Sequence, residues 1–168
     1  MSEVLVNSDL PERRKKKRPV AEKAIYTAGY EGRTVDEFLN LLMESGISRL
    51  IDVRSNPISR RYGFHKSTLT RLCGSLEIDY QHLPELGIPG SERDHIDSAA
   101  KYTSLFKNYR CGLASRESAL SNAISLLETK PSVLVCMETD PEFCHRNVLA
   151  QHLTTLINMP IKHLGCPT

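Results

Sequence analysis

The sequence predicts an α/β domain, a Rossmann-like three-layer sandwich with a mostly parallel sheet of four to five strands. Short apolar runs rich in β-branched residues alternate with longer segments whose apolar residues recur at helical spacing. The chain has 168 residues, 40% of them hydrophobic and 25% charged, which suits one globular domain with a sizeable core. No apolar run approaches the roughly 20 residues that span a bilayer, and no apolar stretch typical of a secretory signal follows the N-terminus. We therefore expect a cytoplasmic protein.

Residues 1–23 are predicted to form a flexible basic tail ahead of a single domain at residues 24–168. Of the 22 Lys and Arg residues, seven lie in the tail beside four acidic residues, while the remainder carries fifteen against sixteen. Six consecutive cations at 13–18 could attract nucleic acid by releasing counterions from its phosphates. A solvated tail without a specific partner is the alternative.

The first strand is expected at residues 24–27, and a glycine-flanked turn connects it to a helix. Thr34 and Glu37 have the spacing of a capping box, which marks the start of that helix. Two glycines between a strand and a helix allow close backbone approach, so free amides of the turn could bind an anion. A plain connecting turn is the alternative. Tyr30 lies in this turn and is a candidate substrate-binding residue.

The second strand is expected at residues 49–54, with Asp52 and Arg54 at its carboxyl end. In a parallel sheet that end shares an edge with the carboxyl ends of the other strands, where ligands bind. Residues 58–66 follow as a loop rich in cations and aromatics, which suits a phosphate or a nucleic acid. We interpret Arg54 and Arg60 as anion-binding residues, whereas the aromatic side chains of the loop are expected to pack into the core.

The middle of the chain continues the alternation of helix and strand. A helix at 67–76 precedes a third strand at 78–83, and His82 near the end of that strand could carry a proton, bind a ligand or be structural. An irregular connection at 84–91 is long enough to be a lid or a binding loop. Residues 98–128 then read as two helical pieces, one of which would cover the sheet.

Reactive residues gather where a buried strand at 132–137 leads into a helix at about 141–157. A last strand is expected at 161–164. The turn between the strand and the helix holds two thiols, a carboxylate, an imidazole and a guanidinium, which are Cys136, Glu138, Cys144, His145 and Arg146. This is more polar chemistry than a packed core needs, and it falls at the ligand-binding edge of the sheet. We interpret it as the functional site.

The first hypothesis is a cysteine-dependent transferase or hydrolase that acts on an anionic, phosphate- or nucleotide-containing substrate. Five cysteines in an ordinary composition indicate thiols rather than disulfides, and Cys73 falls on a helical core stripe. The pKa argument favours Cys144, in the first turn of a helix, and placement at the strand tip favours Cys136. Glu138 and Asp52 are candidates for general acid or base. The substrate would be clamped by three arginines, Arg54, Arg60 and Arg146.

Other hypotheses stay open. Thiolate and imidazole suit zinc or iron, although the gap between the two cysteines is unlike that of structural zinc sites. The candidate ligands are Cys136, Cys144, His145 and His82. A third hypothesis is a nucleic-acid-binding or processing module that uses the basic tail and the arginine-rich loop. The two cysteines could also be buried small hydrophobes, and Glu138 and Arg146 could form a buried ion pair without chemistry.

Four segments carry a family resemblance: YTAGYEGR at Tyr26–Arg33, IDVRSNPISR at Ile51–Arg60, YQHLPELG at Tyr80–Gly87 and CMETDPEFCHR at Cys136–Arg146. In this order they resemble the bacterial and archaeal domain of unknown function 488, over about residues 24–165. The resemblance implies a Rossmann-like parallel sheet and a set of shared positions, without a settled reaction or cofactor. Those positions are Asp52, Arg54, Ser59, Arg60, Cys136, Glu138, Cys144, His145 and Arg146. On this ground Ser59 joins the substrate-binding candidates.

Overall fold

A five-stranded, entirely parallel sheet forms the centre of the protein, with the strand order β3-β2-β4-β1-β5. The computed structural model describes residues 17–166. The strands are β1 (Ile25–Gly29), β2 (Arg49–Asp52), β3 (Asp79–His82), β4 (Ser132–Cys136) and β5 (Ile161–Leu164). The predicted α/β class with a mostly parallel sheet is therefore confirmed.

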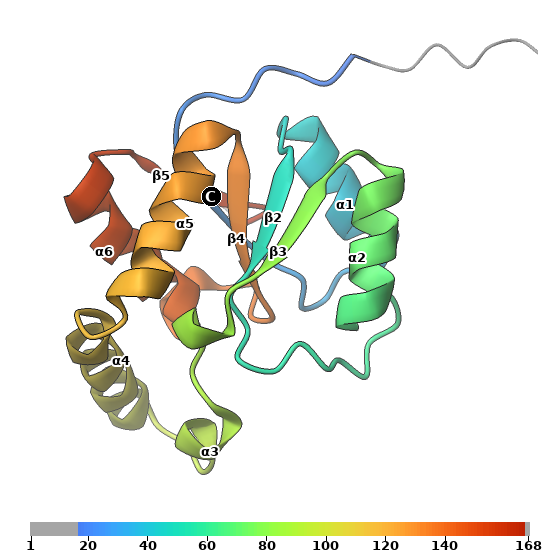
Figure 1. Ribbon diagram of the computed structural model, residues 1–168. Coiled ribbons are helices and arrows are strands. Elements are labelled where there is room, and N and C mark those ends of the chain that lie inside the picture. The colour runs from blue at the N-terminus through green and yellow to red at the C-terminus, as the bar shows by residue number, and fades with distance from the viewer. Residues whose placement is uncertain (1–16, 167–168) are drawn as a thin grey trace, which may run out of the picture.

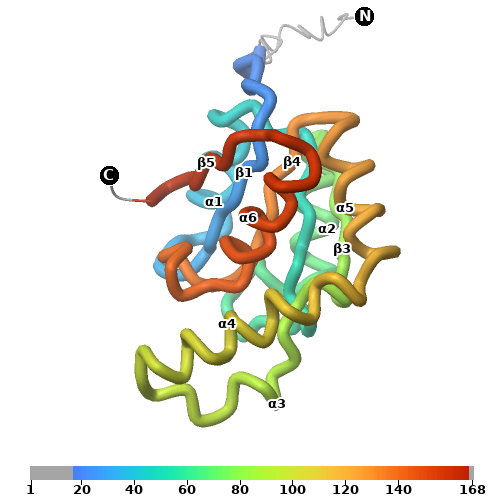
Figure 2. Tube along the Cα trace, turned by 90° about the vertical axis from the view of Figure 1, so that its left-hand side faces the viewer, coloured from blue at the N-terminus to red at the C-terminus, as the bar shows by residue number. Residues whose placement is uncertain are grey.

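Helices cover both faces of this sheet, as Figures 1 and 2 show. One face packs against α1 (Val35–Glu44) and α2 (Lys66–Ser75), and the other against α4 (Ala99–Leu113), α5 (Glu117–Thr129) and α6 (His145–Ile157). Because both faces are buried, the inner strands read as continuous apolar runs rather than as alternating ones. No helix within residues 17–166 is long and apolar enough to cross a membrane.

Strand alternation divides the core into two apolar clusters. Leu50, Val133 and Val135 point toward α1 and α2, whereas Ile51 and Leu134 point toward α4, α5 and α6. The side chain of any strand residue is thereby assigned to one face or the other. The face to which a side chain points therefore determines which polar residues at the end of the sheet can meet.

Short elements fill the connections around the sheet edge. The predicted irregular segment after β3 contains a 3-10 turn, η1 (Pro84–Leu86), and a four-residue helix, α3 (Gly90–Arg93). A second 3-10 turn, η2 (Pro141–Phe143), separates β4 from α6, so the expectation of one helix from residue 141 was wrong. The side chain of Asp140 accepts a hydrogen bond from the amide of Glu142 and closes η2 locally. Cys144 is consequently the N-cap of α6, in extended conformation, and not a member of its first turn.

The described part of the predicted tail, residues 17–23, runs along the domain. Arg18 donates to the carbonyl of Ile47 at 3.3 Å, and Glu22 pairs with Lys162. Gly46 allows this approach, because a Cβ there would lie 2.5 Å from the carbonyl oxygen of Pro19. The first four cations of the basic run, residues 13–16, lie outside the described residues, so its predicted role in binding nucleic acid stays a prediction.

The strand order places the end of β4 at a switch in topology. The chain leaves β1 and β2 into α1 and α2 on one face, but it leaves β4, which lies between them, into α6 on the other face. In open parallel sheets the connections diverge at such a point, and a crevice forms at the carboxyl ends of the strands. Cys136 is the last residue of β4 and aligns with Gly29 of β1.

Candidate active site

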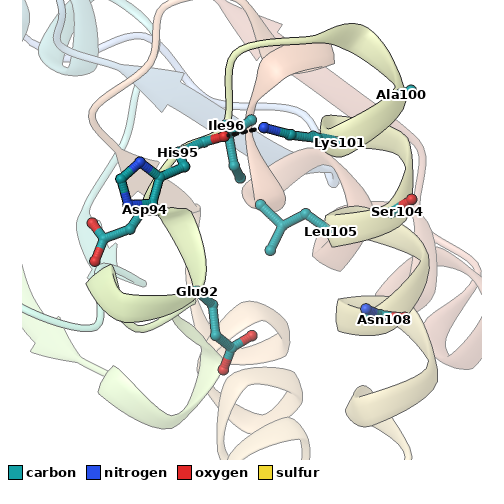
Figure 3. A pocket seen from close by; sticks show the side chains of 9 residues that line it. All are labelled: Glu92, Asp94, His95, Ile96, Ala100, Lys101, Ser104, Leu105 and Asn108. Carbon is teal, nitrogen blue, oxygen red and sulfur yellow. Dashed lines mark hydrogen bonds between the residues drawn. The ribbon is translucent and has the colours of Figure 1, made fainter.

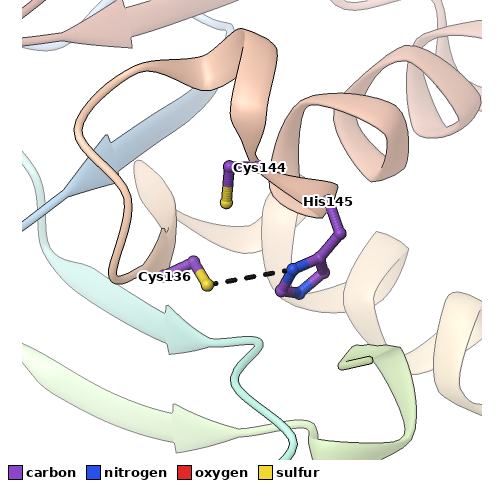
Figure 4. A group of neighbouring side chains, drawn as sticks. All are labelled: Cys136, Cys144 and His145. Atoms are coloured by element: carbon purple, nitrogen blue, oxygen red, sulfur yellow. Dashed lines mark hydrogen bonds between the residues drawn. The ribbon is translucent and has the colours of Figure 1, made fainter. Parts of the chain in front are cut away.

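Cys136, Cys144 and His145 converge at the carboxyl end of β4 (Figure 4). Their potential ligand atoms all lie within 4.8 Å of one another, and Cys136 Sγ is 3.8 Å from His145 Nδ1. All three side chains are buried, with at most 2% of their surface exposed. They come from a strand end, a helix N-cap and the first residue of the helix. The strand-to-helix turn between them therefore builds the cluster.

The hydrogen bonds of His145 fix the tautomer of its imidazole. Nε2 lies 2.9 Å from the carbonyl oxygen of Val53, which can only accept, so Nε2 carries the hydrogen. Nδ1 lies 2.9 Å from a terminal nitrogen of Arg93, which can only donate, so Nδ1 presents its lone pair. The ring of Tyr109 packs edge-on against the imidazole at 5.4 Å between centroids. An imidazole held in a fixed orientation thus faces Cys136.

Arg93 of α3 is the site residue that sequence reasoning missed. Its guanidinium bridges His145 and Glu138, with a 2.8 Å ion pair to Glu138 Oε1. Burial raises the pKa of Glu138, and the charge of the nearby Cys136 thiolate raises it further, while Arg93 opposes both. Within the described chain, Glu138 Oε2 and Arg93 Nε are buried without a hydrogen-bond partner. The cluster therefore contains one hydrogen-bond acceptor and one donor that have no partner.

The two cysteines differ in acidity. The hydrogen bond from Cys144 lowers the pKa of Cys136 well below its usual value, and His145 and Arg93 add to that effect against the cost of burial. Burial raises the pKa of Cys144 well above its usual value, and the charge on Cys136 raises it further. The earlier pKa argument for Cys144 is thus reversed, since complete burial outweighs the helix dipole. Cys136 is therefore the more acidic of the two thiols.

A cavity of about 170 Å³ opens onto Cys136. Cys136 and His145 form part of its wall beside the guanidinium groups of Arg54 and Arg93, and Cys144 does not line it. The remaining wall comes from Tyr30, Ser55, Asn56, Ile58, Ile88, Gly90 and Met137. A molecule that entered would meet the Cys136 sulfur between two cations.

A larger hollow of about 510 Å³ lies between α3 and α4 (Figure 3). Its wall mixes acidic, basic and neutral side chains, among them Glu92, His95 and Lys101. It holds none of the residues predicted to form the site. Size alone therefore does not identify the functional cavity, and the chemistry of the lining favours the smaller one.

Asp52 does not join the cysteine cluster, contrary to its predicted role as a catalytic acid or base. It aligns with Val135 in the neighbouring strand, so both side chains point toward α1 and α2, whereas Cys136, one residue on, points to the other face. Its buried carboxylate accepts from the backbone and guanidinium of Arg54 and from the hydroxyl of Tyr80 at 2.6 Å. Asp52 is thus a support for Arg54.

Arg54 lines the cavity, but most of its donors are already engaged. Besides two bonds to Asp52, the guanidinium donates to the hydroxyl of Tyr30 and to the carbonyl of Phe64, both at 2.9 Å. Tyr30 is held in turn by stacking on Phe64, with ring centroids 4.1 Å apart. Four of the five N–H groups are therefore used, and Arg54 offers the cavity its charge and one donor.

Arg146 supports the site loop from within the protein. Its side chain is fully buried and donates to the carbonyls of Glu138 and Thr139, the second at 2.9 Å. It does not line the cavity, so the structure offers no support for its predicted contact with substrate. The suggested ion pair of Glu138 with Arg146 is also absent, since the Glu138 carboxylate pairs with Arg93.

Three further candidates lie away from the cavity wall. His82 donates from Nε2 to the carbonyl of Arg54 at 2.9 Å and accepts from Lys66, so it supports the backbone after β2. Ser59 accepts from the amide of Arg61 at 3.1 Å, in a local turn, and Arg60 is exposed. None of these three candidates lines the cavity.

The glycine-flanked turn after β1 holds the site loop rather than an anion. The amide of Glu31 donates to the carbonyl of Met137 at 2.8 Å, and the hydroxyl of Thr139 donates to the carbonyl of Glu31. A Cβ on Gly29 would lie 1.8 Å from the carbonyl oxygen of Glu138, so only glycine allows this approach.

The same cluster could offer a metal two sulfurs and one nitrogen. The carbonyl of Val53 orients the imidazole as outer-shell groups do in metal sites. However, the guanidinium of Arg93 occupies the lone pair of His145 Nδ1, the nitrogen that faces the sulfurs, and His82 bonds elsewhere. A fixed positive charge at that point opposes a second cation, so the arrangement fits a thiolate better than a metal.

Comparison with known proteins yields one match. A family model described as Domain of unknown function DUF488 matches residues 34–153. This range contains all three residues of the cluster together with Arg54, Arg93 and Glu138. Neither the curated proteins nor the solved structures give a match.

Proposed function

This chain belongs to the DUF488 family, a domain of unknown function, and from the geometry of its site we propose that it is a cysteine-dependent enzyme acting on a small anionic substrate. The observation that carries the proposal is the placement of Cys136. Its sulfur belongs to a buried pair of thiols, its pKa is lowered by Cys144 and by the charges around it, and it faces a cavity with Arg54 and Arg93 in its wall. Thiolates are the nucleophilic form of cysteine, and paired cations favour an anion beside them.

The volume of the cavity limits the substrate. About 170 Å³ is less than the roughly 300–1,000 Å³ of sites that enclose drug-sized ligands. A small organic acid, a phosphate-bearing group or one end of a larger molecule would fit, and a whole nucleotide would remain partly outside. Arg93 would make the main contact with the anion, because Arg54 has one donor left.

The remaining residues have supporting parts in the proposed reaction. Cys136 would attack an electrophilic atom of the substrate, forming a bond from sulfur and displacing a leaving group. Glu138 does not line the cavity, so we assign it the role of setting the charge beside Cys136 through its ion pair with Arg93, and the leaving group would take its proton from solvent. Transfer of the bound group to water or to another acceptor would complete hydrolysis or transfer.

Selective alkylation of the native protein tests this proposal. The rates at which anionic iodoacetate and neutral iodoacetamide label each cysteine are measured by peptide mass spectrometry. We expect Cys136 to react faster than the buried Cys73, whose pKa burial raises to about 12. The ratio of iodoacetate to iodoacetamide rates should be higher at Cys136 than at the exposed Cys111, by about three- to tenfold.

Two variants show whether the cavity cations cause that preference. Arg93→Gln should lower the rate ratio at Cys136, whereas Arg60→Gln, which removes an exposed cation outside the cavity, should leave it unchanged. Equal ratios at Cys136 and Cys111 would remove the case for an anionic substrate. A Cys136 that stays inert while Cys111 is labelled would remove the case for a nucleophile.

A further inference from the structure

Cys144 has no part in the proposed attack on an anionic substrate, yet its sulfur lies within 4.8 Å of the nucleophile. It does not line the cavity, so substrate would not touch it. Both sulfurs nevertheless belong to the same buried cluster, so the Cys144 thiol lies beside the reactive sulfur. A second thiol in that position suits a reaction in which Cys136 is first oxidised.

We propose that Cys136 and Cys144 form a reversible disulfide and that the protein thereby reduces a small hydroperoxide. This activity goes beyond the proposed function but rests on the same reactive Cys136. Access is asymmetric, since the cavity leads a small molecule to Cys136 and leaves Cys144 behind it. A hydroperoxide is small enough for the cavity, and Arg93 lies where negative charge would develop on its leaving oxygen.

The reaction balances in three steps. The Cys136 thiolate attacks one peroxide oxygen, so that an S–O bond forms, the O–O bond breaks and the departing alkoxide takes a proton to become an alcohol. The Cys144 thiol then attacks the resulting sulfenic acid, the S–S bond forms, and hydroxide leaves with the thiol proton as water. A dithiol reductant restores both thiols and is itself oxidised to a disulfide.

The segment between the two cysteines allows the sulfurs to approach bonding distance, about 2.05 Å. Its first half is anchored, because Arg146 holds the carbonyls of Glu138 and Thr139 beside Cys136. Its second half is the 3-10 turn η2, and Phe143 at the end of that turn is about half exposed. Cys144 follows in extended conformation, so it can shift toward Cys136 without unwinding α6.

Cys166 is the competing partner in the described part of the chain. Its sulfur donates to the carbonyl of Thr139 at 3.6 Å, so it lies against the same loop. It is partly exposed and does not belong to the cluster of Cys136, Cys144 and His145. The test below therefore compares variants of Cys144 and Cys166.

The experiment treats the reduced full chain with an equal amount of hydrogen peroxide and follows free thiols and peptide masses. We expect the number of free thiols to fall from five to three. The peptide that contains Cys136 should become linked to the peptide that contains Cys144, and dithiothreitol should reverse the linkage fully. In Cys144→Ser, a sulfenic acid should remain on Cys136, and its dimedone adduct should exceed that of the wild type at least about tenfold. Cys166→Ser should behave like the wild type.

Several outcomes would overturn the inference. These are a linkage between Cys136 and Cys166, a sulfenic acid that persists in the wild type, or the absence of any linkage while Cys136 alkylates readily. The last result would leave the proposed enzyme intact, whereas a Cys136 inert to both alkylation and peroxide would end both proposals. Circular dichroism and the protection of the buried Cys73 from labelling show whether each serine variant is folded.

Discussion

Two groups of charged side chains lie on opposite faces of the same sheet edge, and they differ in how completely their charges are paired. On the side of α1 and α2, Asp52 accepts four hydrogen bonds from Arg54 and Tyr80. On the side of α6, Glu138 pairs with Arg93 through one oxygen and leaves the other without a partner. The first group is saturated, whereas the second keeps one buried carboxylate oxygen without a hydrogen-bond partner.

This difference helps to separate support from function. Each group pairs a carboxylate from the end of a strand with an arginine, but Asp52 and Arg54 are buried, whereas Glu138 and Arg93 are partly exposed. A saturated network can only hold its members in place, because a new ligand would have to displace an existing bond. The α6 side keeps atoms without partners next to Cys136, and its Arg93 lines the cavity, so it is the better candidate for chemistry.

The largest expected effect comes from breaking the saturated group. Asp52→Ala leaves Arg54 buried without its carboxylate, so the free energy of unfolding should fall by about 3–5 kcal/mol. Urea titration measures it, with Asp94→Ala, at an exposed aspartate, expected to change stability by no more than about 0.5 kcal/mol. The rate at which neutral iodoacetamide alkylates Cys136, per folded molecule, should stay near that of the wild type. A large loss of Cys136 reactivity with little loss of stability would reverse the roles assigned to the two groups.

A smaller effect should follow from disturbing the turn that holds the site loop. In Gly29→Ala the new methyl group would lie 1.8 Å from the carbonyl oxygen of Glu138, and relief of this clash should cost about 2–3 kcal/mol. The matched control is Gly32→Ala, where nothing lies within 4 Å and the positive φ of 79° should cost only about 1 kcal/mol. Thermal unfolding and Cys136 alkylation should both change in the first variant. Unchanged alkylation in Gly29→Ala would mean that the turn does not position the loop.

The cluster around Cys136 was predictable from the sequence because it is local. One strand, one short turn and the start of one helix supply Cys136, Glu138, Cys144 and His145, so their convergence follows from the parallel sheet. Arg93 could not be found in the same way, because it comes from a four-residue helix in an irregular connection, 45 residues before its partner Glu138. No periodicity marks such a residue in one sequence.

Asp52 was misplaced for a different physical reason. The sequence correctly puts it at the carboxyl end of a strand, and that edge does hold the site. Its face relative to Cys136 depends on the register between β2 and β4, which pairs Asp52 with Val135. A shift of one residue would have placed it beside the thiols, and nothing in either strand alone specifies that shift.

The smallest expected effect on stability should come with a clear effect on reactivity, from Glu138→Gln. Burial raises the pKa of Glu138 in the folded protein, so the ionised carboxylate is less favourable there than in the unfolded chain, and its ionisation at neutral pH opposes folding. Removing it should therefore change the free energy of unfolding at pH 7 by no more than about 1 kcal/mol, and in the stabilising direction. The negative charge near Cys136 also disappears, so the pH midpoint of Cys136 alkylation should move down by about half a unit to one unit. Glu142→Gln, at an exposed carboxyl in the same loop, is the control and should leave the midpoint unchanged. A midpoint that stays fixed in Glu138→Gln, together with a loss of several kcal/mol in stability, would show that the α6 side is a structural network like that of Asp52.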